Sequence, residues 1–193
     1  MIEFHTNKKL SRAFSINLAK WKRWSREFLP PDPLGGLQSG YARQYNLDEA
    51  FTVFLGGHLV GVLKFTIPES RQILHDLHQW LVDHDFYFYF FATASPEKKS
   101  FHQVQSYRIA IINTDISNDN RSGLAYRVKA TFTVESINFN GVQMSQERFI
   151  EFPLGLRDHE PAQLNAHSYR ILNISALRKA FLAHLQASPP INP

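Results

Sequence analysis

The run from Leu18 to Pro31 is the feature that most constrains how the first part of this chain folds. It reads Leu-Ala-Lys-Trp-Lys-Arg-Trp-Ser-Arg-Glu-Phe-Leu-Pro-Pro. Apolar and small side chains recur at three- and four-residue spacing, as on one face of a helix: Leu18, Trp21, Ser25 and Phe28. The spacing predicts a helix over residues 8–29, with Ser15 as a candidate N-cap and Pro30-Pro31 as its end.

Lysines and arginines lie mostly on the other side of this helix: Lys20, Lys22, Arg23 and Arg26. The first 30 residues contain seven basic and two acidic residues, a balance of +5 in a chain whose net charge is +4. This asymmetry favours an anionic partner, and a solvated basic face is the alternative. Trp21 and Trp24 lie on or near the apolar stripe, so we expect them in the core rather than stacked on unpaired bases.

The 193 residues include no cysteine, which excludes thiolate metal sites, disulfides and cysteine nucleophiles. The N-terminus lacks the apolar stretch of a secretory signal, and no segment approaches the about 18 apolar residues that a membrane helix needs. We therefore expect a cytoplasmic protein that does not enter a membrane. The length suits one large domain or two small ones.

Two more helices are expected before residue 82. Asn46 is the predicted N-cap of the first, and the glycines within 56–61 are expected to weaken its far end. Thr66 is the predicted N-cap of the second, because Pro68 follows it just inside the helix. This helix is expected to end near Val82.

Strand patterns dominate the chain after residue 82. The aromatic run Phe86–Phe91 predicts a strand in the core, with a ligand pocket or a dimer interface as alternatives. Three further strands are expected at 103–112, 125–139 and 142–152, the last two joined by a turn at Asn140-Gly141. A helix is expected at 175–186.

Side chains alternate along 125–139, and Arg127 and Lys129 belong to the outward set. A solvated sheet face is the simplest interpretation of this basic row. Binding of an anionic ligand and a wider DNA footprint are the alternatives.

We therefore predict an α+β fold. A helical domain at residues 1–82 is expected to precede an antiparallel β-rich domain at 83–193 that a C-terminal helix closes. The second domain is expected to dimerise the protein or to receive a signal.

Residues 10–75 resemble the DNA-binding domain of the MerR family, a winged helix-turn-helix. Five segments carry the resemblance in order: Leu10-Ser11 with Phe14-Ser15, Trp21–Pro30, Gly40-Tyr41 with Arg43–Tyr45, Asn46–Ala50, and Leu63–Glu69. They are similar to the family's first helix and turn, its recognition helix, its wing, and the starts of its third and fourth helices. The chain departs from the family pattern at the inserted Ala42, at Phe28 in place of a glycine, and in the short helix after Pro68.

The resemblance implies a bacterial transcriptional regulator that binds double-stranded DNA as a homodimer. It assigns the recognition helix to the major groove and adds Tyr41 and Arg43 on the wing to the DNA-contacting set of Lys20, Lys22, Arg23 and Arg26. Arg23 and Arg26 are the better base readers, because a guanidinium can bond guanine at two positions. A small-molecule ligand in the C-terminal domain is a further expectation.

Other function classes have weaker support. His75 and His78 share a helix face, but no recognised metal-ligand motif surrounds them, so we expect no metal site and no cofactor. No pairing of a nucleophile with a base is evident, and we do not expect an enzyme. Two alternatives to a regulator remain: a DNA architectural or recombination accessory factor, and a protein-interaction adaptor without DNA binding.

Overall fold

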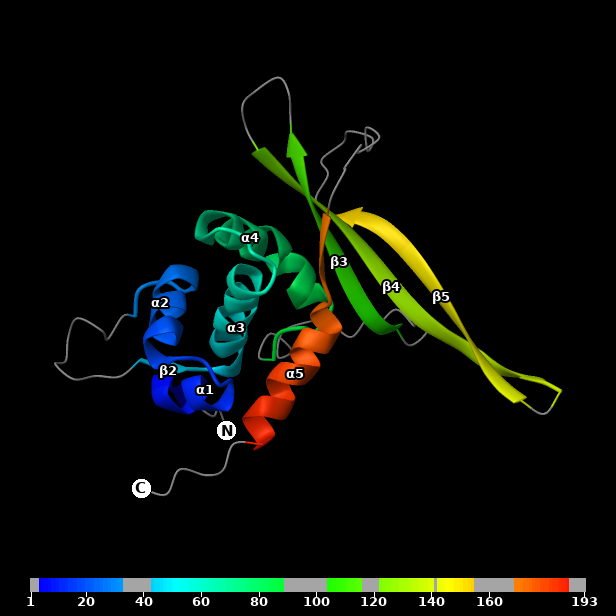
Figure 1. Ribbon diagram of the computed structural model, residues 1–193, viewed down its shortest axis with the longest axis horizontal. Coiled ribbons are helices and arrows are strands. Elements are labelled where there is room, and N and C mark those ends of the chain that lie inside the picture. The colour runs from blue at the N-terminus through cyan, green and yellow to red at the C-terminus, as the bar shows by residue number, and fades with distance from the viewer. Residues whose placement is uncertain are drawn as a thin grey trace. The chain divides into compact units, whose positions relative to one another are not determined.

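The computed structural model describes residues 4–32, 43–88, 104–115, 122–140, 142–154 and 169–187. These contain five helices and two antiparallel sheets, which confirms the α+β class (Figure 1). The chain forms two compact units, one of residues 1–95 with 177–193 and the other of residues 96–176. The predicted boundary at residue 82 differs from this division, above all because most of the C-terminal helix belongs to the first unit.

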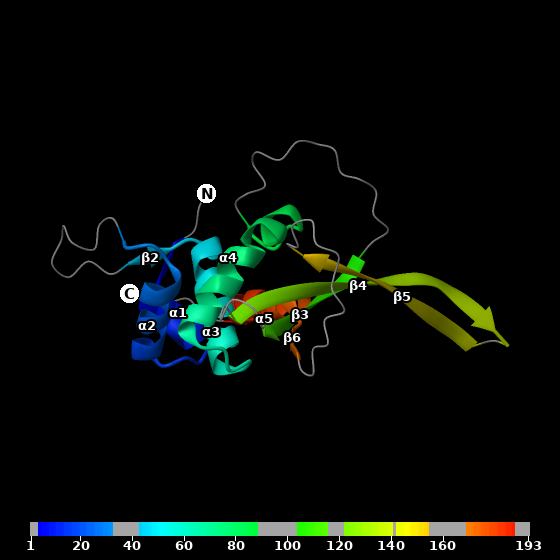
Figure 2. The same ribbon diagram turned by 90° about the horizontal axis from the view of Figure 1, so that it is seen from above.

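The first unit is built mainly from helices. They are α1 (Asn7–Ala13), α2 (Leu18–Phe28), α3 (Leu47–Gly61), α4 (Ile67–Asp83) and most of α5 (Ile174–Ala187). The strands β1 (His5–Thr6) and β2 (Gln44–Tyr45) pair antiparallel beside α1. α2 and α3 lie side by side in both ribbon views (Figure 1, Figure 2).

A turn separates α1 from α2, so the single helix expected over residues 8–29 is wrong. Ser15 has a φ of 53°, which an α-helix does not allow, and it does not cap α2. Asn17 is the N-cap instead, because its side-chain oxygen accepts hydrogen bonds from the backbone of Ala19 and Lys20. The break falls at Phe14 and Ser15, in the segment that resembles the end of the family's first helix and its turn.

The glycines of α3 do not end the helix, and two of them lie in close contact with side chains of α2. The helix continues to Gly61. A Cβ atom on Gly56 would lie 2.4 Å from the Phe28 ring, and one on Gly57 would lie 2.3 Å from the Trp24 ring. These two positions therefore let α2 approach α3 more closely than any larger residue would permit.

The predicted caps of α3 and α4 are confirmed. Asn46 accepts a hydrogen bond from the backbone N–H of Glu49, whose carboxylate accepts from the backbone N–H of Asn46. Thr66 and Glu69 form the same reciprocal arrangement at the start of α4. Both helices therefore begin where the sequence predicted.

The core of the first unit is aromatic. Phe181 of α5 lies with its ring centroid 5.2 Å from that of Phe14 and 5.2 Å from that of Phe51. Phe86 and Tyr87 are buried in the same unit. The strand expected at Phe86–Phe91 is absent over residues 86–88, and residues 89–91 lie outside the described ranges.

The second unit contains a four-stranded antiparallel sheet with the order β5-β4-β3-β6. Its strands are β3 (Val104–Asp115), β4 (Ser122–Phe139), β5 (Val142–Leu154) and β6 (Tyr169–Leu172). The first three confirm the predicted strands, whereas β6 was not predicted. The hairpin of β4 and β5 continues beyond the β3 pairing, and Asn140 in its turn has a φ of 51° (Figure 2).

Within the described ranges, none of the helices is long and apolar enough to cross a membrane.

Candidate nucleic-acid interface

One face of α2 is anchored in the core of the first unit. Trp21 and Trp24 are buried, as predicted, and the Trp21 ring stacks on Phe14 with centroids 5.6 Å apart. Ser25 is also buried. Leu18 was also expected on this stripe, but it is the first residue of α2 and 38% of it is exposed. The buried face of the helix begins at Trp21.

The opposite face of α2 exposes the four basic residues that the sequence singled out: Lys20, Lys22, Arg23 and Arg26. Across the described ranges, none of the four forms a hydrogen bond or an ion pair with another described residue, although Lys20 Nζ lies 4.9 Å from the Trp24 ring centroid. The one acidic residue of the helix, Glu27, is paired elsewhere: Arg71 of α4 donates to its carboxylate and, at 2.8 Å, to its backbone oxygen. The positive charge of this face is therefore not neutralised by the helix itself.

A groove of about 570 Å³ runs along one edge of α2. Ala19, Lys22 and Arg26 line it from the helix, and Arg43 and Tyr45 line it from the β2 side. Lys20 and Arg23 are not among its lining residues. The four basic residues of α2 therefore form two pairs. Lys22 and Arg26 line the groove, and Lys20 and Arg23 lie on the exposed surface outside it.

Arg43 has a structural role that its place in the predicted wing did not reveal. Its guanidinium donates at 2.8 Å to the backbone oxygen of Pro30 and at 3.2 Å to the carboxylate of Glu49. Only 14% of the side chain is exposed. Arg43 therefore fastens β2 to the end of α2 and to the start of α3, and it presents little free charge to a ligand. Tyr41, the other predicted wing residue, lies outside the described ranges.

A buried polar cluster supports α2 from below the groove. Tyr45 Oη lies 2.6 Å from Asn7 Oδ1 and 2.8 Å from Ser25 Oγ, so β2, α1 and α2 meet at one hydroxyl. Burial raises the pKa of Tyr45 above that of a free tyrosine, which keeps the phenol protonated and able to donate. The sequence carried no signal for this cluster, because its members are far apart in the chain.

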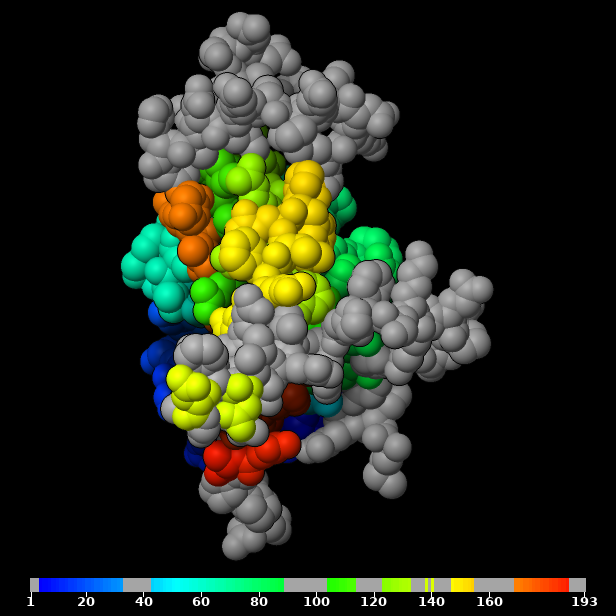
Figure 3. Space-filling model, turned by 90° about the vertical axis from the view of Figure 1, so that its right-hand side faces the viewer, coloured from blue at the N-terminus to red at the C-terminus, as the bar shows by residue number. Residues whose placement is uncertain are grey.

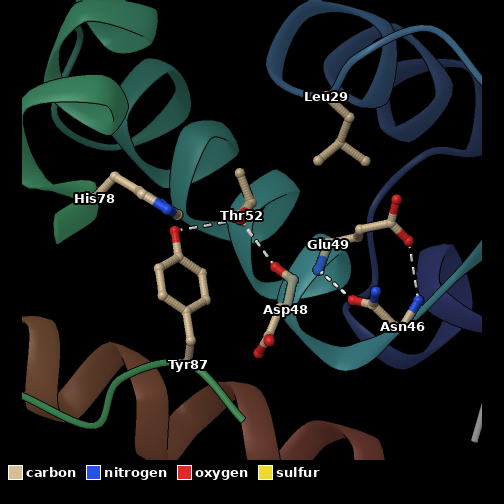
Figure 4. Close-up of a pocket in the computed structure, with 7 residues that line it drawn as sticks. All are labelled: Leu29, Asn46, Asp48, Glu49, Thr52, His78 and Tyr87. Atoms are coloured by element: carbon tan, nitrogen blue, oxygen red, sulfur yellow. Dashed lines mark hydrogen bonds between the residues drawn. The ribbon is translucent and has the colours of Figure 1, made fainter. Parts of the chain in front are cut away.

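A second hollow, of about 350 Å³, lies among α3, α4 and the segment after α4 (Figure 4). Thr52 Oγ1 lies 3.4 Å from Tyr87 Oη and donates at 2.8 Å to the backbone oxygen of Asp48. Burial raises the pKa of Tyr87, so its phenol is poorly suited to act as a base. Asn46 and Glu49 are engaged in the cap of α3, and Thr52 bonds to the backbone of the same helix. The hydrogen bonds of these three side chains therefore stabilise α3.

The histidines of α4 do not assemble a metal centre with other described residues. No group of three histidine, aspartate or glutamate side chains with suitable geometry occurs within the described ranges. His84 instead stacks on Trp80, with ring centroids 4.2 Å apart.

A comparison with protein-family models gives no match, and neither does a comparison with curated proteins. The likeness to the MerR family therefore rests on the five sequence segments.

Proposed function

We propose that the protein is a cytoplasmic, sequence-specific transcriptional regulator that binds double-stranded DNA through α2. The observation that carries the proposal is the two-sided character of this helix. Trp21 and Trp24 hold one face against α1 and α3, while the other face exposes four cations that form no hydrogen bond or ion pair with other described residues. A rigidly held helix with an exposed basic face suits insertion into a major groove.

The support around α2 strengthens the proposal. The close approach at Gly57, the Arg71–Glu27 pair and the Tyr45 cluster restrain the helix from three directions. Such restraint lets a helix present its side chains to base edges in a fixed register. In this scheme Arg23 and Arg26 read bases, Lys20 and Lys22 contact phosphates, and Arg43 positions the wing.

The proposal includes a homodimer, because a single short helix contacts few base pairs and two-fold operators are the usual solution. Sedimentation of the full chain at several concentrations measures the oligomeric state directly.

Salt dependence separates DNA binding from the adaptor alternative. We expect the affinity of the full chain for duplex DNA, measured by fluorescence anisotropy, to fall steeply as salt rises. The slope of log K against log salt should be about −0.9 for each phosphate neutralised. An affinity that does not change with salt would exclude a phosphate-contacting basic face and would favour the adaptor.

A further inference from the structure

The two faces of the sheet in the second unit carry different side chains. One face is apolar, with Ile109, Ile111, Val128 and Leu172 buried. The opposite face carries basic residues, with Arg108 and Arg127 exposed and Lys129 partly exposed. Figure 3 shows the sheet in space-filling form, with β6 in orange, β5 in yellow and parts of β3 and β4 in green between them.

Strand register brings the charged residues of the basic face together. Arg108 of β3 pairs with Lys129 of β4, which in turn pairs with Glu151 of β5. Arg127 pairs with Ala110 two positions further along. Residues directly opposite on neighbouring strands have close Cβ atoms, so three cations from two strands share one small area.

A hollow of about 260 Å³ lies at this place. Ala110 contributes only a methyl group, and it pairs with Arg127 on one side and with Ile171 of β6 on the other. Ile112 pairs with Tyr169, and both belong to the lining. The hollow therefore has basic side chains toward β4 and an apolar and aromatic wall toward β6.

The charge in this hollow is only partly balanced. Lys129 Nζ lies 3.8 Å from the Glu151 carboxylate and 3.5 Å from the Phe149 ring centroid. Arg108 and Arg127 form no hydrogen bond or ion pair with other residues in the described ranges. Like charges opposite each other destabilise a sheet, so an anion bound between them would remove a repulsion as well as add an attraction.

The apolar and aromatic wall toward β6 favours a ligand that has an apolar part as well as an anionic group. Tyr169 is 60% exposed and Ile171 is 49% exposed, although both are large side chains at the rim of the hollow. Guanidinium groups bind carboxylate and phosphate oxygens in a planar, two-pronged geometry. The volume of about 260 Å³ lies below the range of about 300–1,000 Å³ that is usual for ligand pockets, so the hollow suits a small ligand.

We propose that this hollow binds a small organic anion. Arg108 and Arg127 hold its carboxylate or phosphate group, and Tyr169 and Ile171 cover its flat apolar body. Lys129 remains with Glu151 and sets the edge of the site. The site lies wholly within residues 96–176, so the proposal does not depend on DNA binding by α2.

The test uses two fluorescent probes with the full chain. Anilinonaphthalene sulfonate has an aromatic body and an anionic group, and phenylnaphthylamine has a similar body without the charge. We expect saturable binding of the sulfonate, weakened at least about tenfold by Arg108→Gln and by Arg127→Gln, with little change for the uncharged probe. Displacement by benzoate or by phenyl phosphate then tells which anionic group the site prefers.

Arg148→Gln is the matched control, because Arg148 is exposed on β5 and belongs to the alternate set that faces away from Glu151. It removes the same charge from the same sheet and should leave sulfonate affinity unchanged. The proposal is overturned if Arg108→Gln and Arg127→Gln bind the sulfonate as tightly as the wild type. It is also overturned if all three variants weaken binding equally, or if the two lining variants lose affinity for DNA and none for the sulfonate.

Discussion

Phe181→Ala should lower the free energy of unfolding of the first unit by about 3–5 kcal/mol, as expected when a large core aromatic is truncated. The Phe181 ring is fully buried, and its centroid lies 5.2 Å from that of Phe51 and 5.6 Å from that of Phe54. Removal of the ring leaves a cavity at the point where α5 meets α3. The loss is measured by urea denaturation.

Tryptophan fluorescence makes this experiment specific to one unit. All three tryptophans, Trp21, Trp24 and Trp80, lie in the first unit. Lys179→Ala on the same helix is the control and should change stability by less than about 0.5 kcal/mol, because Lys179 is exposed. If α5 instead served only the β-rich unit, as the sequence indicated, Phe181→Ala would leave the tryptophan transition where it is.

The second large effect is expected at the exposed face of α2. Arg23→Ala combined with Arg26→Ala should weaken binding to a selected duplex by about 3 kcal/mol, roughly 100-fold, since two base-reading arginines are lost. Both side chains are exposed, so thermal stability should change little. Fluorescence anisotropy with the duplex gives the affinity, and thermal unfolding checks the fold.

Net charge needs its own control, because any loss of positive charge weakens attraction to DNA. Arg148→Ala combined with Lys179→Ala removes two exposed cations outside α2 and should reduce affinity only slightly. Equal losses in the two double variants would mean that overall charge, and not α2, governs the interaction.

Local signals predicted the local structure well. The reciprocal caps at Asn46 and Thr66 depend on side chains three residues apart, so the sequence displays them directly. The alternation along β4 likewise placed Val128 and Lys129 on opposite faces, as the strand register confirms.

Tertiary contacts account for what the sequence did not predict. The break between α1 and α2 depends on a positive φ at Ser15, a conformation that serine gives no reason to expect. The sequence predicted that Gly57 weakens the end of α3, whereas the structure shows that Gly57 lies against the Trp24 ring. The sequence predicted that α5 closes the β-rich domain, whereas most of the helix belongs to the first unit, because an apolar helix face shows that a helix is buried but not against which element.

The basic residues of the two candidate sites could likewise be predicted only in part, because some of their roles depend on tertiary contacts. The sequence identified the exposed cations of α2 from helical spacing alone. The resemblance to the MerR family added Arg43 to them, although the Pro30 oxygen and the Glu49 carboxylate engage its guanidinium. The hollow on the basic face of the sheet could not be predicted, because it depends on the pairing of Arg108 with Lys129, which only the strand register shows.

Site-directed DNA cleavage tests most directly whether α2 enters the major groove. The chain contains no cysteine, so a single cysteine can carry an iron chelate that cuts nearby DNA. Ala19→Cys places the chelate on the exposed face of α2, and Gln79→Cys places it on an exposed position of α4. We expect the Ala19 conjugate to cut a selected duplex at a few adjacent nucleotides and the Gln79 conjugate to cut it weakly or not at all. Cutting by the Ala19 conjugate that is no stronger and no more localised than that of the Gln79 conjugate would contradict the account.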